Sequence, residues 1–191
     1  MKITKSYEGL TESQCFYYFY GNLLSDDDLD IYLDKPLIVY GNIYAKYGIF
    51  SKNTIEASGS IDSGGCIQSK YGYIEGEESI TAELGIKTGL GIYSAGSIRS
   101  GGNIKSKTDI RSGENIEADG CIEAEKYITA FGSIISGKHI KSGNSIEARI
   151  RIMAKNYIGA RESIYACYTI KCSKIIRGYV KHGDLVLTNE K

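Results

Sequence analysis

Isoleucine recurs along most of the chain at a spacing of six residues. It occupies 23 positions from Ile43 to Ile176, and 21 of the 22 steps between them are six residues, while the step from Ile67 to Ile74 is seven. The residue two places after each of them is Ala ten times, Ser nine times, Gly twice, and Thr and Cys once each. A period of six turns through about 600° around a helix axis, so these isoleucines would not share one helical face. The pattern therefore excludes an amphipathic helix.

The same pattern predicts one short β-strand in every six-residue repeat. Side chains alternate along a strand, so each Ile and the small residue two places later point to one side, and their neighbours point outward. Glycine precedes eight of the 23 isoleucines by two places, which suits a corner because glycine adopts backbone conformations that other residues avoid. Three repeats then form a triangular coil of about 18 residues. We predict an all-β, single-domain parallel β-helix of seven to eight coils, with the extra residue after Ile67 forming a bulge at a corner.

The core of this β-helix follows from the repeat. Each coil places three isoleucines and three small residues inside, so that Ile stacks on Ile and Ala or Ser stacks on Ala or Ser. The hydroxyl of an inward Ser needs a partner, most simply a neighbouring backbone carbonyl or the Ser one coil away. The repeat region is expected to span residues 37–180.

The two ends of the chain differ from the repeat. Residues 1–36 contain an aromatic run at 16–20 followed by an acidic run, and we expect them to cap the first coil, because an open end would expose isoleucines and strand edges. Residues 181–191 are expected to form an end strand or a cap. The segment 178–187 stays apolar to within four residues of the terminus, so it either closes the rod or leaves an adhesive end.

The order Ile-x-Ala/Ser, preceded by Gly-x, is seen in Gly59–Ser63 and in Gly102–Ser106. A strict six-residue repeat resembles hexapeptide-repeat proteins in general. In the left-handed hexapeptide acyltransferases, however, the small residue lies two places before the aliphatic one. The order found here is more similar to the bactofilin-like, polymer-forming right-handed β-helices, and the resemblance covers residues 37–180. A right-handed helix is therefore favoured, as for most parallel crossovers, and a left-handed one remains the alternative.

Composition excludes several classes of protein. Lys and Arg together number 23, as do Asp and Glu, so the whole-chain charge points to no partner. No apolar run reaches the roughly 18 residues of a membrane span, and the first residues lead into no apolar segment, so neither a span nor a signal peptide is expected. The five cysteines are odd in number and form no CxxC pair. We therefore expect reduced thiols, a cytoplasmic location, and neither a structural zinc nor a cofactor.

Candidate catalytic residues are few. The chain has two histidines, and the one at position 139 directly precedes Ile140, where it is expected to be an exposed surface residue. No long loop interrupts the repeat beside it, whereas the hexapeptide acyltransferases use a His next to a protruding loop. Cys66 and Cys121 occupy equivalent outward columns about three coils apart, roughly 14 Å, too far for a disulfide. We predict no catalytic residue and no metal site.

The repeat assigns surface charge to faces even though the total is zero. Residues one and three places after each Ile point outward, and every third repeat shares a face. One face carries two carboxylates, Glu123 and Glu125, and eight cations. The cations are Lys52, Lys70, Lys87, Lys105, Lys107, Lys141, Arg161 and Arg177. The charges of the second face cancel, and the third is slightly acidic. A basic stripe along a rod suits a polyanion, while the alternative is that solvated Lys rows only oppose aggregation.

These observations favour a non-enzymatic structural or interaction protein. It would be a rigid β-helical scaffold that self-associates through its C-terminal end, or that presents a face to another protein. The first alternative is a binding module whose basic face engages nucleic acid or an acidic protein surface; a phage-encoded inhibitor of a host defence enzyme would be one example. A hexapeptide-type acyltransferase is the second alternative, and the missing loop and histidine pattern disfavour it.

Overall fold

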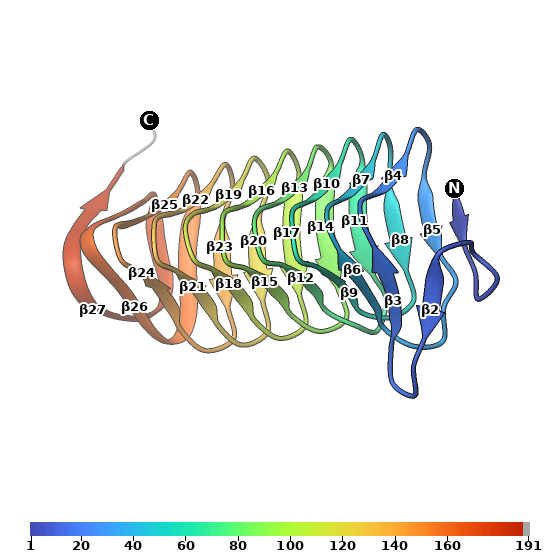
Figure 1. Cartoon of the computed structure of the whole chain (residues 1–191). Coiled ribbons are helices and arrows are strands. Elements are labelled where there is room, and N and C mark those ends of the chain that lie inside the picture. The colour runs from blue at the N-terminus through green and yellow to red at the C-terminus, as the bar shows by residue number, and fades with distance from the viewer. Residues whose placement is uncertain (189–191) are drawn as a thin grey trace.

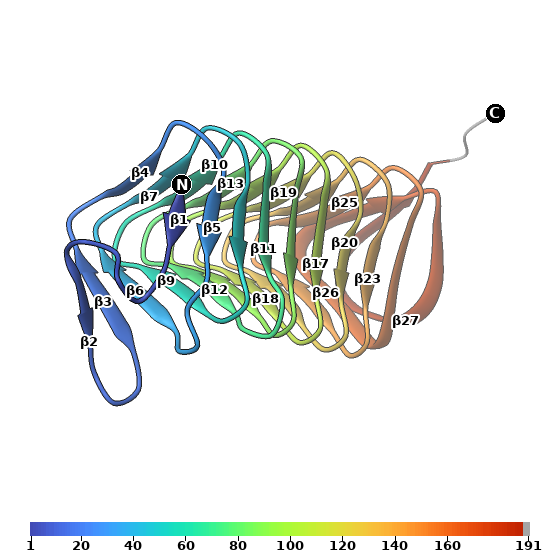
Figure 2. The same ribbon diagram turned by 90° about the vertical axis from the view of Figure 1, so that its right-hand side faces the viewer.

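The computed structural model is a parallel β-solenoid of about nine turns with about 18 residues in each turn (Figures 1 and 2). It describes residues 1–188, with the backbone alone for 175–177 and 182–183. Each regular strand pairs in parallel with the strands one turn before and one turn after it, as Ile92 does with Ile74 and Ile110. Over the described residues there is no helix able to span a membrane. The all-β, single-chain β-helix is confirmed.

The strands form three faces, which we name by their outward charges. The basic face comprises β5 (Leu29–Ile31), β8 (Ile49–Ser51), β11 (Cys66–Ser69), β14 (Gly85–Thr88), β17 (Asn103–Ser106), β20 (Ile122–Ala124) and β23 (Ile140–Ser142). The neutral face comprises β4 (Leu23–Ser25), β7 (Ile43–Ala45), β10 (Ile61–Ser63), β13 (Ile80–Ala82), β16 (Ile98–Ser100), β19 (Ile116–Ala118), β22 (Ile134–Ser136) and β25 (Arg151–Ala154). The acidic face comprises β3 (Tyr17–Tyr20), β6 (Leu37–Tyr40), β9 (Ile55–Ala57), β12 (Ile74–Gly76), β15 (Ile92–Ser94), β18 (Ile110–Ser112), β21 (Ile128–Ala130) and β24 (Ile146–Ala148).

The core is one continuous column of apolar side chains along the axis. The repeat isoleucines from 43 to 170 are at most 1% exposed. Each inward Ser closes a corner: the hydroxyl of Ser112 donates to the carbonyl of Gly96 at 2.7 Å and accepts the N–H of Glu114 at 3.1 Å. Ser136 repeats the arrangement at a corner of the neutral face, with the carbonyl of Gly120. No buried side-chain polar atom of the described residues lacks a partner, as the sequence predicts for inward Ser.

Glycine is required at the corners because it is small. The sequence suggested a different reason, its freedom to adopt unusual backbone conformations. Among the described residues, positive φ occurs only at Gly9, Gly21 and Gly178. Gly21 lies at a corner of the first turn, between β3 and β4, whereas the corner glycines from 41 to 143 have no positive φ. The corner glycines instead pass close to the chain one turn below. A Cβ placed on Gly113 would overlap the carbonyl oxygen of Ala95, so the stacking distance between turns requires glycine here.

The solenoid begins earlier than the repeat in the sequence. Strands β3 to β5 already form a turn, paired in parallel with β6 to β8. Tyr17, Leu23 and Leu29 take the positions of the isoleucines, and Ile31 takes the position of a small residue. These replacements, and a step of eight residues from Leu29 to Leu37, hide the repeat. Residues 17–31 therefore belong to the solenoid and raise the number of turns above the seven to eight counted from the isoleucines.

The cap is correspondingly shorter than residues 1–36. Strand β1 (Lys2–Ile3) pairs in parallel with β5, and β2 (Leu10–Glu12) pairs antiparallel with β3 in a hairpin that projects at the N-terminal end (Figure 2). The ion pairs Lys5–Asp34 at 2.9 Å and Lys35–Glu12 at 2.6 Å join the cap to the first turn. Two of the three strands of the first turn are thus covered.

The last turns change character. Strand β26 (Tyr157–Cys172) runs through a whole turn without interruption, and β27 (Lys174–Leu187) pairs with it in parallel with several register shifts. Ile175, Val180 and Leu185 lie opposite the isoleucines of β26, so the spacing shortens from six residues to five. The strand continues across residues 180 and 181, where the sequence suggested a boundary.

Replacing a central isoleucine tests the stacked core. We expect Ile110→Ala to lower the free energy of unfolding by about 2–5 kcal/mol, because the narrow core leaves a cavity that its neighbours cannot fill. Ile135→Ala is the matched control, since Ile135 lies at an outward, half-buried position of β22. Denaturant unfolding followed by circular dichroism measures both. Equal losses from the two variants would contradict the assigned inward and outward positions.

Replacing a corner glycine tests the close approach of successive turns. We expect Gly113→Ala to cost about 1–3 kcal/mol, because its Cβ meets the backbone of the turn below, which cannot move without disturbing the stack. Gly85→Ala is the control, because the nearest atom to its Cβ is 3.2 Å away. Thermal unfolding measures both variants, and Gly113→Ala should have the lower midpoint temperature. A loss from Gly85→Ala as large as that from Gly113→Ala would contradict the role of the close approach at Gly113.

Candidate functional site

The column of outward residues along the basic face is built by the strand register. Lys87 of β14 lies opposite Lys105 of β17, which lies opposite Glu123 of β20, which in turn lies opposite Lys141 of β23. Neighbouring strands of a parallel sheet are about 4.8 Å apart, so the side chains of this column are held side by side. Lys87, Lys105 and Lys141, three of the eight cations that the sequence assigns to one face, therefore lie in one column.

Five of the eight predicted cations line one shallow groove on the basic face. They are Lys87, Lys105, Lys107, Lys141 and Arg161, and Glu123 and Glu125 share the groove with them. Lys52 and Lys70 are exposed on earlier turns and do not line this groove, and the Nζ of Lys70 lies 5.0 Å from the ring centre of Tyr71. The backbone of Arg177 lies opposite Gly159, the next position of the column, but its side chain is outside the described residues.

The groove has one internal ion pair. The Nζ of Lys105 lies 2.9 Å from Oε2 of Glu123. Partial burial alone would raise the pKa of Glu123, but the hydrogen bonds from Lys105 and His139 outweigh it and hold the pKa below its usual value. Within the described part of the chain no ion pair involves Lys87, Lys107 or Lys141. These three lysines therefore form no ion pair, and the five cations of the groove outnumber its two carboxylates.

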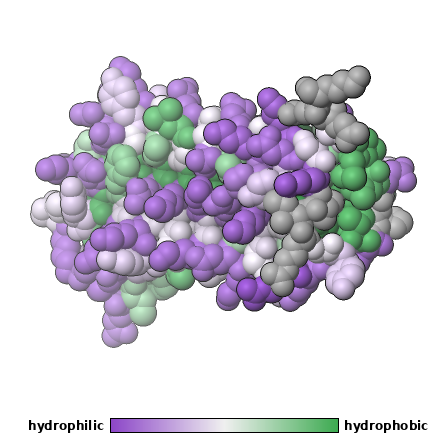
Figure 3. All heavy atoms as spheres, turned by 180° about the vertical axis from the view of Figure 1, so that it is seen from behind, coloured by the Kyte–Doolittle hydropathy of each residue, from purple (hydrophilic) through white to green (hydrophobic). Residues whose placement is uncertain are grey.

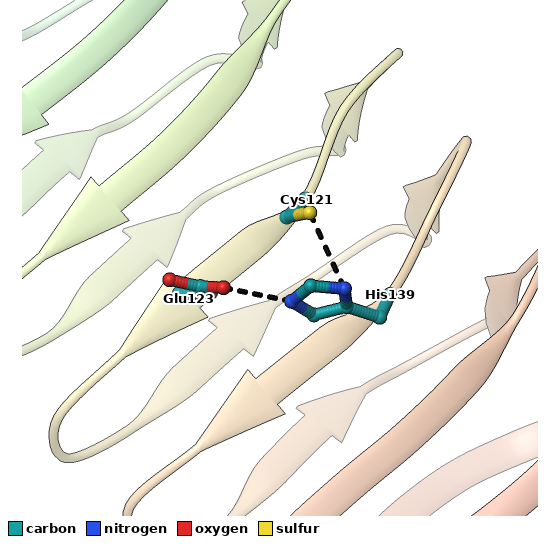
Figure 4. Close-up of side chains that lie close together, drawn as sticks. All are labelled: Cys121, Glu123 and His139. Atoms are coloured by element: carbon teal, nitrogen blue, oxygen red, sulfur yellow. Dashed lines mark hydrogen bonds and ion pairs between the residues drawn. The ribbon is translucent and has the colours of Figure 1, made fainter.

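A second cluster adjoins the groove and consists of Cys121, Glu123 and His139 (Figure 4). The Sγ of Cys121 lies 3.3 Å from Nδ1 of His139, and the Nε2 of His139 lies 2.7 Å from Oε1 of Glu123. The imidazole therefore lies between the thiol and the carboxylate, with a different nitrogen toward each. Glu123 belongs to both the cluster and the groove.

The fold holds the imidazole of His139 in place on several sides. Its ring stacks on that of Tyr157 with centres 4.5 Å apart and an angle of 5° between the planes. Its backbone carbonyl accepts hydrogen bonds from the N–H of Ile122 and from the hydroxyl of Ser136. The side chain is 19% exposed, so the expectation of an exposed surface histidine is wrong.

The sequence contained a signal for this cluster. Cys121 and His139 both directly precede a repeat isoleucine, and they are 18 residues apart, which is one turn. The register of β20 on β23 therefore makes them neighbours in one column. Glu123 reaches the same imidazole from the position two residues after Cys121.

The ligand-type atoms of the cluster lie within 4.8 Å of one another, close enough for a metal ion to be considered. A zinc ion, however, takes one nitrogen of each imidazole together with sulfur and oxygen around a single point. Here the two ring nitrogens point at two different partners, and Tyr157 stacks on the ring that would have to turn. The arrangement is that of a hydrogen-bonded chain from thiol to imidazole to carboxylate.

The basic face thus carries two features. One is a groove in which three lysines form no ion pair, and the other is the thiol–imidazole–carboxylate chain beside it. Comparisons of the chain with family models, with curated proteins and with solved structures give no match. Function is therefore inferred from the side chains and edges of this chain alone.

Proposed function

We propose that the protein is a non-enzymatic scaffold that self-associates through its C-terminal end. The supporting observation is the unpaired outer edge of β27. This strand pairs with β26 on one side, and no described strand pairs with its other side. An uncovered strand edge offers a row of backbone donors and acceptors to another strand.

The side chains at this end are also apolar. Leu185, Val186 and Leu187 are 45%, 42% and 53% exposed. Figure 3 shows hydrophobic residues gathered at the end of the rod that carries the C-terminus, and others scattered among hydrophilic residues toward the opposite end. At the opposite end, β1 and β2 cover strands of the first turn. The contrast between the ends favours association through β27.

A second copy of the chain is the occupant that fits best. Two rods related by a two-fold axis would place one β27 against the other, so that both edges pair and both apolar patches are covered. Such a contact is self-complementary and needs no other partner. The similarity of the repeat pattern to polymer-forming β-helices supports self-association, and a cytoplasmic location, expected from the unpaired cysteines, belongs to the same proposal.

A charge at the exposed edge tests self-association. We expect the full chain to form dimers at micromolar concentration and Val186→Lys to shift them to monomers, because a lysine on each copy would oppose its symmetry mate. Sedimentation velocity measures the change. Leu84→Lys is the matched control, since Leu84 is 64% exposed at a corner in the middle of the rod. A monomeric full chain at high micromolar concentration, or an equal effect of the control, would reject the proposal.

A second candidate function is the binding of a nucleic-acid duplex along the basic face. The observation that favours it is the groove in which Lys87, Lys107 and Lys141 form no ion pair and cations outnumber carboxylates. Side chains spaced by about 4.8 Å per turn can follow a line of phosphates. Contacts of this kind attract a polyanion without reading its sequence.

Charge reversal tests the second candidate. We expect Lys87→Glu/Lys107→Glu/Lys141→Glu to abolish retention of a labelled DNA duplex, and the affinity of the unaltered protein to fall with salt with a log–log slope of about −0.9 per phosphate contacted. Fluorescence anisotropy at several salt concentrations measures both. Glutamate at Tyr44, Thr81 and Arg99, on the neutral face, is the control. Equal losses of affinity from the two faces, or no binding at low salt, would reject the nucleic-acid candidate and leave self-association as the proposed function.

A further inference from the structure

The protonation of the Cys121–His139–Glu123 chain can be assigned from its partners. The low pKa of Glu123 keeps its carboxylate ionised, so it only accepts hydrogen bonds, and the Nε2 of His139 must carry the proton that it receives. In the neutral ring, Nδ1 then holds a lone pair, and this atom faces the thiol at 3.3 Å. Cys121 therefore donates its S–H to a base whose other side is fixed by a carboxylate.

This is the arrangement that turns a thiol into a nucleophile. A base within hydrogen-bonding distance removes the proton as sulfur attacks, and a carboxylate behind the base orients it and stabilises its charged form. Cys121 is a buried residue with 9% of its surface exposed, and it lies outside the continuous apolar core cluster. We infer that Cys121 is a base-assisted nucleophilic thiol that undergoes exchange with anionic low-molecular-weight disulfides.

Disulfide exchange fits the surroundings of the thiol better than acyl transfer does. Acyl transfer needs free N–H donors for an oxyanion, but the N–H of Cys121 already donates to Oδ1 of Asn103 at 2.8 Å. Exchange at a disulfide passes through no oxyanion. The groove beside the thiol holds Lys87, Lys107 and Lys141 without ion-pair partners among the described carboxylates, and these select a disulfide that carries negative charge.

The exchange balances within the groups named. The Sγ of Cys121 attacks one sulfur of the disulfide while its proton passes to Nδ1 of His139. The new S–S bond forms as the old one breaks, and the other half leaves as a thiolate with the electron pair of that bond. His139 then returns the proton to the leaving thiolate. The incoming disulfide is the oxidant, and Cys121 ends as a mixed disulfide.

The chain itself contains a matched control thiol. Cys66 occupies the same position in the same column, directly before Ile67 of β11, and it is more exposed than Cys121. Gly85 lies where His139 would be, and Gln68 lies where Glu123 would be. Accessibility alone predicts that Cys66 reacts faster, whereas the thiol–imidazole–carboxylate chain predicts the reverse.

The test uses the full chain with Cys15→Ser and Cys167→Ser, to which either Cys66→Ser or Cys121→Ser is added. Release of nitrothiobenzoate from dithiobisnitrobenzoate, a dianionic disulfide, measures the rate at pH 6, where a thiol without a base is scarcely ionised. A third variant lacking both thiols gives the background from Cys172. We expect Cys121 to react at least about tenfold faster than Cys66. A Cys121 rate equal to or below that of Cys66 would overturn the inference.

Substitutions within the cluster separate chemistry from folding. His139→Asn should reduce the Cys121 rate at least about tenfold, with an unchanged circular dichroism spectrum. Glu123 is a positioning residue, so Glu123→Gln should lower the rate most at low pH and change the shape of the pH profile. The other titratable neighbours of the cluster are Lys105, Lys141 and Tyr157. An unchanged rate in His139→Asn would contradict base assistance.

Two further measurements complete the test. Gln68→Glu/Gly85→His transplants the cluster to Cys66 and should raise its rate, because the register that aligns Cys66 with Gly85 is the one that aligns the native cluster. Neutral dithiodipyridine should show a smaller preference for Cys121 than the dianionic disulfide does, because only the effect of the base remains. Lys87→Gln/Lys141→Gln should reduce the preference for the dianionic disulfide to that smaller value. A preference that is the same for both disulfides would contradict selection by the lysines.

Discussion

The solenoid depends on the stacking of isoleucine side chains upon the isoleucines one turn above and below. A triangular coil has a narrow interior, so each corner must also carry a small inward residue two places later, and the Ser among these hydrogen-bond the carbonyl of the turn beneath. The corner glycines follow from the same constraint, because successive turns approach too closely for a Cβ. The sheet register, the corners and the core are thus consequences of one packing arrangement.

A rigid stack converts sequence spacing into surface geometry. Residues one turn apart become neighbours in a column, whatever their chemistry, and the strand pairing holds them at that separation. On the basic face this places Lys87 next to Lys105, and it places Cys121 beside His139. Both features need no loop or cleft. A surface of this kind can carry a reactive group while the core remains uniform.

At each end of the rod, the terminal turn has no further turn to pair with the backbone groups of its outer strand edges. At the N-terminus, β1 and β2 add pairing partners to the first turn, and the ion pairs of Lys5 and Lys35 attach them. At the C-terminus, the spacing falls from six to five and β27 leaves an apolar edge exposed. A second copy would satisfy that edge, which is why self-association and not catalysis is the main functional proposal.

The sequence alone determined the class of fold, the inward and outward positions of residues 43–170, and the face on which each charge lies, because a period of six is incompatible with a helix. Only the tertiary structure showed that Tyr17, Leu23 and Leu29 begin the solenoid, since their replacements for isoleucine and the eight-residue step conceal the period. It also decided the contacts within a column. Whether the imidazole of His139 lies between Cys121 and Glu123 depends on side-chain rotamers and on stacking against Tyr157, and neither is encoded by spacing.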